Sequence, residues 1–153
     1  MPLIAPNEVQ GVLGSFQTNR TNVTVAPADP ATLTSSTSVY KMAGCAVKFT
    51  PVQSTLIEVV VVGVMGNDTA SDNVLVQLAY GTGSAPAKNG AAAGTQFGSI
   101  VTLPVVGTTK VSFTCLGVFT AVLGTTYWLD LASEAVTGGN VILQNLTFVV
   151  KEY

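Results

Sequence analysis

The chain contains no histidine and very little charge. Charged side chains make up 9% of its 153 residues, against about 25% in an average soluble domain. Without histidine, a Ser-His-Asp triad and a histidine general base are excluded, and two cysteines alone do not make a zinc site. Hydrophobic residues make up 48%. Low charge combined with this apolar content indicates that much of the surface is covered by partner chains.

Other partner classes are also disfavoured by what is missing. The six basic residues are scattered and the net charge is −2, whereas nucleic-acid binding needs a clustered basic face. No apolar run reaches the ~20 residues of a membrane helix. The segment from Met1 to Pro6 lacks the basic and long apolar regions of a signal peptide. We therefore expect synthesis in a cytoplasm, no nucleic-acid or membrane partner, and no cofactor.

The stretch from Thr55 to Gly81 has the most regular pattern. Two runs rich in β-branched residues flank a polar, turn-forming segment, which predicts a long β-hairpin. The first run is apolar at nearly every position, so both of its faces are expected to be covered. In the second run, Val74, Val76 and Leu78 are expected to face a core and Gln77 the opposite side.

Further strands are predicted on both sides of this stretch. Their expected ranges are 37–43, 45–50, 99–103, 110–122, 125–132 and 140–152. Gly117 is expected to mark a bulge, and the last strand is expected to turn Ile142, Leu146, Phe148 and Val150 toward the core. No helical period occurs. The pattern predicts an all-β, jelly-roll-like, two-sheet antiparallel β-sandwich of about eight strands.

Residues 1–32 differ from the rest because proline and glycine interrupt them repeatedly. We expect an extended N-terminal arm here and the β-sandwich domain in residues 33–153; a disordered tail is the alternative. The arm nevertheless carries apolar side chains that favour docking on another surface, such as a neighbouring subunit. The expected contact residues are Leu3, Ile4, Val9, Leu13 and Phe16.

The segment from Gly81 to Gly98 and the two cysteines leave alternatives open. The first has small residues and almost no charge, which predicts a long loop, either an exposed tip or a buried subunit contact. Cys45 and Cys115 lie within apolar strand patterns, so we expect free, buried thiols. A disulfide would require facing strands, which the sequence does not reveal.

Few side chains offer chemistry. Glu58 and Asp130 could be paired across a sheet as glycosidase carboxylates are. The favoured interpretation is two single outward or interface charges, because no convergent polar groups accompany either. No catalytic residue is therefore predicted, and the chain is expected not to be an enzyme; a hydrolase is the disfavoured rival.

The polar segment after the first long run offers oxygen ligands for calcium at Asn67, Asp68, Asp72 and Asn73. Their spacing does not match an EF-hand, and a solvated turn is favoured. No metal site is therefore predicted. Asn-x-Thr triplets, which are glycosylation acceptors in secreted eukaryotic proteins, begin at Asn19, Asn22, Asn67 and Asn145; without a signal peptide they are attributed to composition.

Two strings in the sequence are distinctive. They are YGTGSAP at residues 80–86 with the Ala/Gly loop after it, and GTTYWLDL at residues 124–131. Both resemble a β-sandwich module of tailed-bacteriophage structural proteins. YKMAG at residues 40–44 and FTP at residues 49–51 are similar to the opening strands of that family. The resemblance covers residues 38–153. It brings no catalytic motif, and the N-terminal arm lies outside it.

Similar modules occur in head decoration proteins, head fibres and tail fibres. The resemblance implies a non-enzymatic virion structural protein. The chain has no long repetitive shaft, so a capsid decoration (cement) protein is preferred. It would form a homotrimer and bind the major capsid protein or another virion protein. The alternative is a tail-associated receptor- or carbohydrate-binding module, which needs an exposed aromatic platform from Tyr40, Tyr127, Trp128 or Tyr153.

Overall fold

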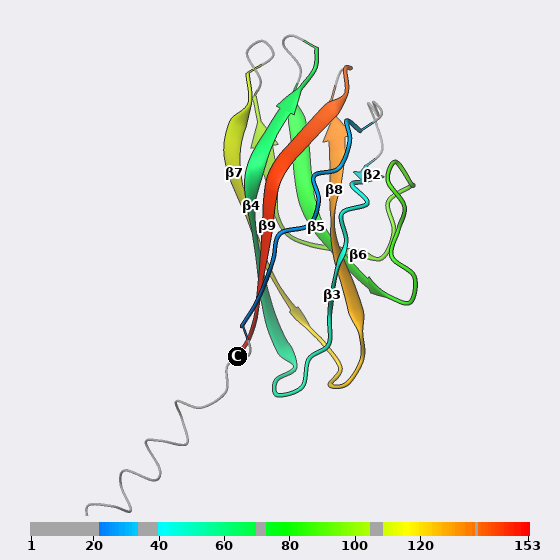
Figure 1. The fold of residues 1–153 in the computed structure, drawn as a ribbon, viewed down its shortest axis with the longest axis vertical. Helices are drawn as coiled ribbons and strands as arrows, with labels where there is room; N and C mark the ends of the chain where they lie inside the picture. Colours follow the sequence, from blue (N-terminus) through cyan, green and yellow to red (C-terminus); the bar gives the residue numbers. More distant parts are fainter. Residues whose placement is uncertain (1–21, 34–39, 70–72, 105–108, 137) are drawn as a thin grey trace, which may run out of the picture.

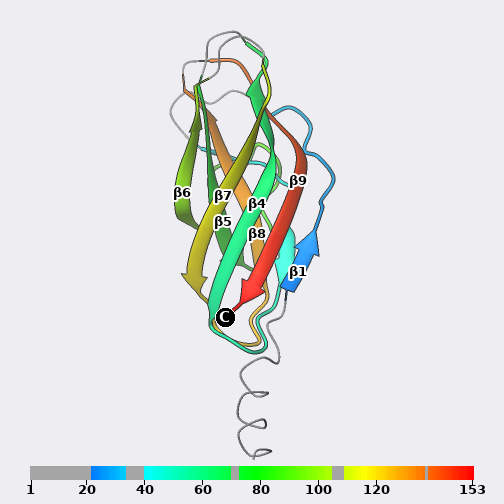
Figure 2. The same cartoon turned by 90° about the vertical axis from the view of Figure 1, so that its left-hand side faces the viewer.

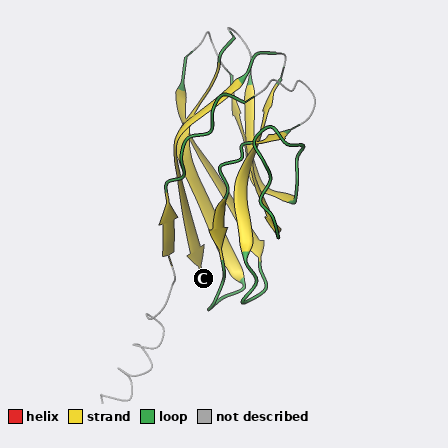
Figure 3. Cartoon of the chain, turned by 45° about the vertical axis from the view of Figure 1, so that its right-hand side comes forward, coloured by secondary structure: helices red, strands yellow, loops and turns green. Residues whose placement is uncertain are grey.

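Two antiparallel β-sheets pack face to face in the computed structural model (Figures 1 and 3). The structure describes residues 22–33, 40–69, 73–104, 109–136 and 138–153. None of these residues forms a helix long and apolar enough to cross a membrane. The arrangement confirms the predicted two-sheet, jelly-roll-like β-sandwich, with nine strands among the described residues where about eight were expected.

The two sheets are called sheet A and sheet B. Sheet A has the strand order β1-β9-β4-β7, with β1 Asn22–Val25, β9 Val141–Glu152, β4 Leu56–Asn67 and β7 Val111–Thr120. Sheet B has the order β2-β8-β5-β6, with β2 Lys41–Met42, β8 Tyr127–Ala135, β5 Val74–Thr82 and β6 Thr95–Leu103. A further strand, β3 Val47–Phe49, also pairs with β8. Figure 2 looks onto sheet A, where β7, β4, β9 and β1 lie side by side.

The predicted hairpin between β4 and β5 is wrong. β4 belongs to sheet A and β5 to sheet B, so the segment after Asn67 crosses from one sheet to the other. The turns from β7 to β8 and from β8 to β9 cross in the same way. Turn-forming residues specify that the chain reverses, but not whether the two strands then pair side by side or face each other. Both arrangements bury the same alternate side chains, so the pattern alone does not separate them.

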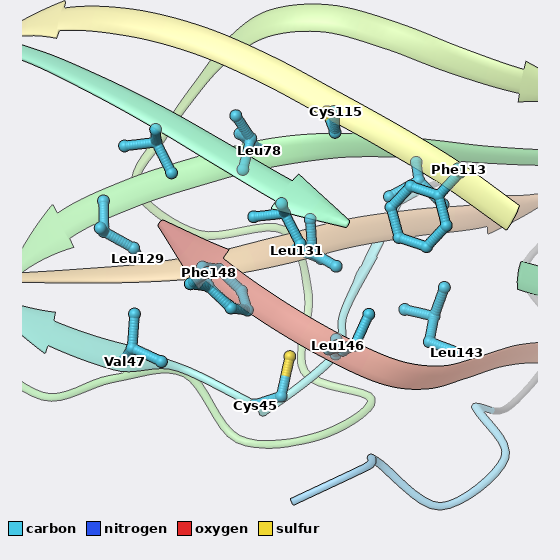
Figure 4. Packing of buried hydrophobic residues seen from close by; sticks show 14 of the residues in the cluster. Cys45, Val47, Leu78, Phe113, Cys115, Leu129, Leu131, Leu143, Leu146 and Phe148 are labelled. Atoms are coloured by element: carbon cyan, nitrogen blue, oxygen red, sulfur yellow. The ribbon is translucent and has the colours of Figure 1, made fainter. Parts of the chain in front are cut away.

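The core lies between the sheets and follows the predicted alternation of β5. Val74, Val76 and Leu78 are fully buried, while Gln77 is half-buried on the other side. Figure 4 shows Phe148 of β9 and Leu129 of β8 as members of the same buried apolar cluster. Burial of such side chains supplies most of the driving force for this fold.

The prediction for β9 is wrong at Ile142, which is only half-buried. Val141 and Leu143 face the core instead, followed by Leu146, Phe148 and Val150. The phase changes because Asn145 has a φ of 53° and the register against β4 shifts there. One extra residue in a strand swaps the faces of all residues beyond it. At Gly117 the β4–β7 register continues without a shift, so the predicted bulge is absent there.

Part of the segment expected to be an arm packs on the sandwich. β1 pairs with β9, and the Leu33 amide donates a 2.9 Å hydrogen bond to the Val141 carbonyl, with the Leu33 side chain buried. Residues 1–21 lie outside the described residues, so the predicted extent of the arm stays a prediction.

Candidate binding surface

Asp130 has a structural role. Its side chain is 0% exposed, and its carboxylate accepts hydrogen bonds from the amides of Gly44 at 3.0 Å and Cys45 at 3.2 Å. The Cys45 thiol at 3.2 Å and the Leu131 amide at 2.8 Å also donate to it. Gly44 and Cys45 lie between β2 and β3, where pairing with β8 is interrupted, so the carboxylate replaces the missing ladder partners. Burial outweighs these donors and raises the pKa of Asp130.

Glu58 and Glu152 are engaged elsewhere. Glu58, in sheet A, forms an ion pair with Lys151 at 3.4 Å, and it therefore does not pair with Asp130 of sheet B. Glu152 is buried and accepts hydrogen bonds from the amides of Gln53 at 2.6 Å and Ser54 at 2.9 Å. No catalytic pair of the glycosidase type is formed by Glu58 and Asp130.

The turn after β4 is held by its own polar side chains. Asn67 Nδ2 donates to the Gly138 carbonyl at 2.9 Å, and Asp68 accepts from both nitrogens of Asn140. These hydrogen bonds from Asn140 lower the pKa of Asp68. Among the described residues no group of three or more histidine, cysteine or acidic side chains could hold a metal; Asp72 lies outside them.

Around Trp128, the outer face of sheet B is covered by its own chain. Trp128 is 4% exposed and packs with Met42, Ala79 and Ala132, partly beneath Ala93 of the β5–β6 loop. Trp128 Nε1 donates to the Thr82 carbonyl at 3.3 Å. The β5–β6 loop is tied to β2 by hydrogen bonds between Met42 and residues 89 and 90. Trp128 therefore does not form an exposed aromatic platform.

Other predicted residues in the interior behave as expected. Cys45 and Cys115 are free and buried, as predicted, and burial raises the pKa of both thiols. Tyr127 is buried and stacks edge-on with Phe119, and its hydroxyl accepts from the Val122 amide at 3.0 Å. Tyr127 therefore does not contribute to an exposed aromatic platform either.

The outer face of sheet A, by contrast, carries aliphatic side chains that the described residues leave uncovered. On β7, Leu116 is 48% and Val118 51% exposed, and on β4, Val62 is 40% exposed. The registers place Val60 between Leu116 and Val149, so aliphatic side chains form a row across three strands. We call this surface the aliphatic face; it comprises Leu56, Val60, Val62, Leu116, Val118 and Val149.

The aliphatic face continues to one end of the sandwich. Val122, 64% exposed, follows β7, and Tyr153, 47% exposed, follows β9 and donates its amide to the Leu56 carbonyl at 3.1 Å. Glu58 and Lys151, which form an ion pair, are charged side chains within the aliphatic face. Three strands over seven residues span about 340 Å² of sheet by strand spacing and rise, and polar side chains at Glu58, Lys151 and three threonines alternate with the aliphatic ones. Clustered exposed aliphatic side chains often mark interaction sites.

The predicted contact residues Leu3, Ile4, Val9, Leu13 and Phe16 all lie outside the described residues, so the structure does not place them. The sequence anticipated only the β4 part of the aliphatic face, through the expectation that both faces of that run are covered; the β7 part was not singled out. A signal was present, because β7 alternates Phe113 and Cys115 on one side with Leu116 and Val118 on the other. Such a strand is apolar on both sides, which predicts a second covered face.

No protein-family model matches the chain, and none of the curated proteins compared with it matches. Among solved structures, a chain from infectious bursal disease virus Gx strain aligns with a TM-score of 0.53 and 11% identity, over 88% of this chain and 33% of that one. The sugar-binding EclA C-terminal domain aligns at 0.44 with 13% identity, over 86% and 79%. The CBM22-1 xylan-binding domain from Paenibacillus barcinonensis Xyn10C aligns at 0.39 with 12% identity, over 84% and 97%. At these identities the first likeness shows a shared β-sandwich fold, and the other two carry no argument.

Proposed function

We propose that this protein is a non-enzymatic structural component of a bacteriophage virion, and specifically a capsid decoration protein. The observation that carries the proposal is the aliphatic face, a sheet surface with exposed aliphatic side chains on a chain with 9% charged residues. A surface of this kind is stabilised when other protein chains cover it. The phage assignment rests on the sequence resemblance over residues 38–153.

The proposed mechanism is passive. The chains associate through apolar surfaces, with a homotrimer as the expected oligomer, and bind the major capsid protein or another virion protein. Binding only to the assembled shell adds free energy to that state and so stabilises it by mass action. The structural roles of Asp130 and Glu58 support this over catalysis, because they leave neither carboxylate as part of a paired acid and base.

The alternative is a tail-associated module that binds a receptor or carbohydrate. Burial of Tyr127 and Trp128 weighs against it, because two of the four candidate aromatic side chains are unavailable. Tyr153 remains 47% exposed at the end of β9, but one exposed ring does not make a platform. The likeness to a chain of a virus structure is compatible with either role and decides neither.

The test uses phage heads that lack this protein. Purified full chain should bind the heads and not isolated tails in a sedimentation assay, and light scattering should show a trimer of 15.7 kDa chains. The double variant Leu116→Thr/Val118→Thr should bind heads at least about tenfold more weakly, since each buried aliphatic side chain contributes about 1 kcal/mol or more.

The matched control is Ile100→Thr, which removes a 51% exposed aliphatic side chain from β6 of sheet B. It should leave head binding unchanged. Equal binding by the double variant and the wild type would contradict the role of the aliphatic face. Binding of the full chain to host cells and not to heads would favour the tail alternative.

A further inference from the structure

The proposed function leaves open what covers the aliphatic face, and the position where β1 begins identifies an occupant. β1 is the edge strand of sheet A, next to β9, and Asn22 lies opposite Lys151. The preceding residues therefore join the sandwich at the end of the aliphatic face that Tyr153 marks. Figure 2 shows β1 beginning close to the C-terminus.

The 21 residues before β1 have the composition that this face requires. Their large apolar side chains match an aliphatic surface, and Glu8 and Arg20 are their only charged side chains. Pro2 and Pro6 disfavour regular ladders or helices. An extended segment of this length reaches up to about 70 Å, whereas the face is about 24 Å long, so reach does not limit contact with another molecule.

The direction of β1 favours a neighbouring molecule. β1 runs antiparallel to β9, so it points from the Tyr153 end of the sheet toward the opposite end. A segment that continued the line of β1 backward from Asn22 would lead away from its own aliphatic face. To cover its own face such a segment would have to reverse direction, whereas covering the face of an adjacent copy requires no reversal.

We propose that residues 1–21 of one copy dock on the aliphatic face of a second copy, so that exchanged arms hold the oligomer together. This inference rests on the proposed function, because it names the partner that covers the surface assigned there. The recognition is apolar contact between arm side chains such as Leu13 and Phe16 and the row formed by Leu116, Val60 and Val149. Exchange links each copy to the next without any contact between the sandwich cores.

The test cross-links the full chain. A photoreactive phenylalanine analogue replaces Phe16, and ¹⁴N- and ¹⁵N-labelled chains are mixed under conditions that let the oligomers exchange. After irradiation, mass spectrometry should find mixed-label cross-links from the arm to residues 56–62, 116–122 or 149–153. Leu116→Thr/Val118→Thr in the acceptor chain should lower the mixed-label yield at least about tenfold, and Ile100→Thr should leave it unchanged. Retained far-ultraviolet circular dichroism shows that the variants are folded.

Several outcomes overturn the inference. Cross-links that join only equally labelled peptides mean that the arm covers its own face, and cross-links to other surfaces mean that the face has another occupant. Absence of cross-links in a chain that light scattering shows to be oligomeric, and that binds heads, rejects arm exchange while the proposed function stands. Failure to bind heads despite mixed-label cross-links rejects the proposed function and leaves arm exchange supported.

Discussion

Replacing Asp130 with alanine should destabilise the sandwich much more than the loss of an ordinary carboxylate does. The substitution leaves the buried Cys45 amide without its acceptor, which costs about 1–3 kcal/mol, and removes the partly buried bond from the Gly44 amide, worth about 1 kcal/mol. The Cys45 thiol also loses its partner. Release of a carboxylate that is costly to bury offsets part of this loss. We expect the free energy of unfolding to fall by about 2–4 kcal/mol.

Equilibrium urea unfolding followed by circular dichroism measures this change, at one fixed chain concentration because association shifts apparent stability. The matched control is Glu58→Ala, whose ion pair with Lys151 is partly exposed and should contribute less than about 1 kcal/mol. Asp130→Asn keeps one acceptor oxygen and should fall between the two. A loss at Asp130→Ala below about 1 kcal/mol, or equal to that of the control, would refute the assigned structural role.

Three further predictions follow from burial, backbone geometry and ionisation. Phe148→Ala should lower the unfolding free energy by about 3–5 kcal/mol and Gln77→Ala by under about 1 kcal/mol in urea titrations; similar small losses would mean that the assigned faces are wrong. Gly94→Ala should lower the unfolding free energy by at least about 1 kcal/mol more than Gly83→Ala does. Both glycines have positive φ, but a methyl group at Gly94 meets a backbone oxygen and the tryptophan ring, whereas Gly83 borders open space. Tryptophan fluorescence during unfolding tests this, and equal losses would contradict it. Burial raises the pKa of Asp130 in the folded chain. Its stabilising contribution is therefore full below the ordinary pKa of an aspartate and is lost as the pH rises through the folded pKa. The stability of wild type relative to Asp130→Asn should decrease from acidic to neutral pH, and an increase would contradict the direction of this pKa shift.

Side-chain alternation predicted the fold class and most of the core. In β5 the period of two is uninterrupted, so Val74, Val76 and Leu78 were assigned to the core correctly. In β9 the same argument failed at Ile142, because the backbone at Asn145 adopts a positive φ and shifts the phase. Asparagine tolerates that conformation but does not require it. Its presence alone therefore does not reveal a bulge.

The candidate surface was less accessible to sequence reasoning. Leu116 and Val118 are of the same residue types as the core side chains. Only the tertiary structure shows that Phe113 and Cys115 face the core instead. The role of Asp130 depends on amides 85 and 86 residues away, and no local pattern encodes such a contact. The burial of Trp128 depends on the β5–β6 loop folding over it. The glycine content of that segment predicted a loop but not the path that the loop takes.

The positions of β8 and β9 have a consequence for synthesis of the chain on the ribosome. β9 lies between β1 and β4, and β8 lies between β5 and the pair β2 and β3, so each is translated after the strands that it joins. Neither sheet can close its ladder until these late strands have emerged. Interrupted translation before Val141 would leave β4 with an open, valine-rich edge, which is a template for association with other strands. Incomplete chains are therefore expected to need chaperone protection that the finished sandwich does not.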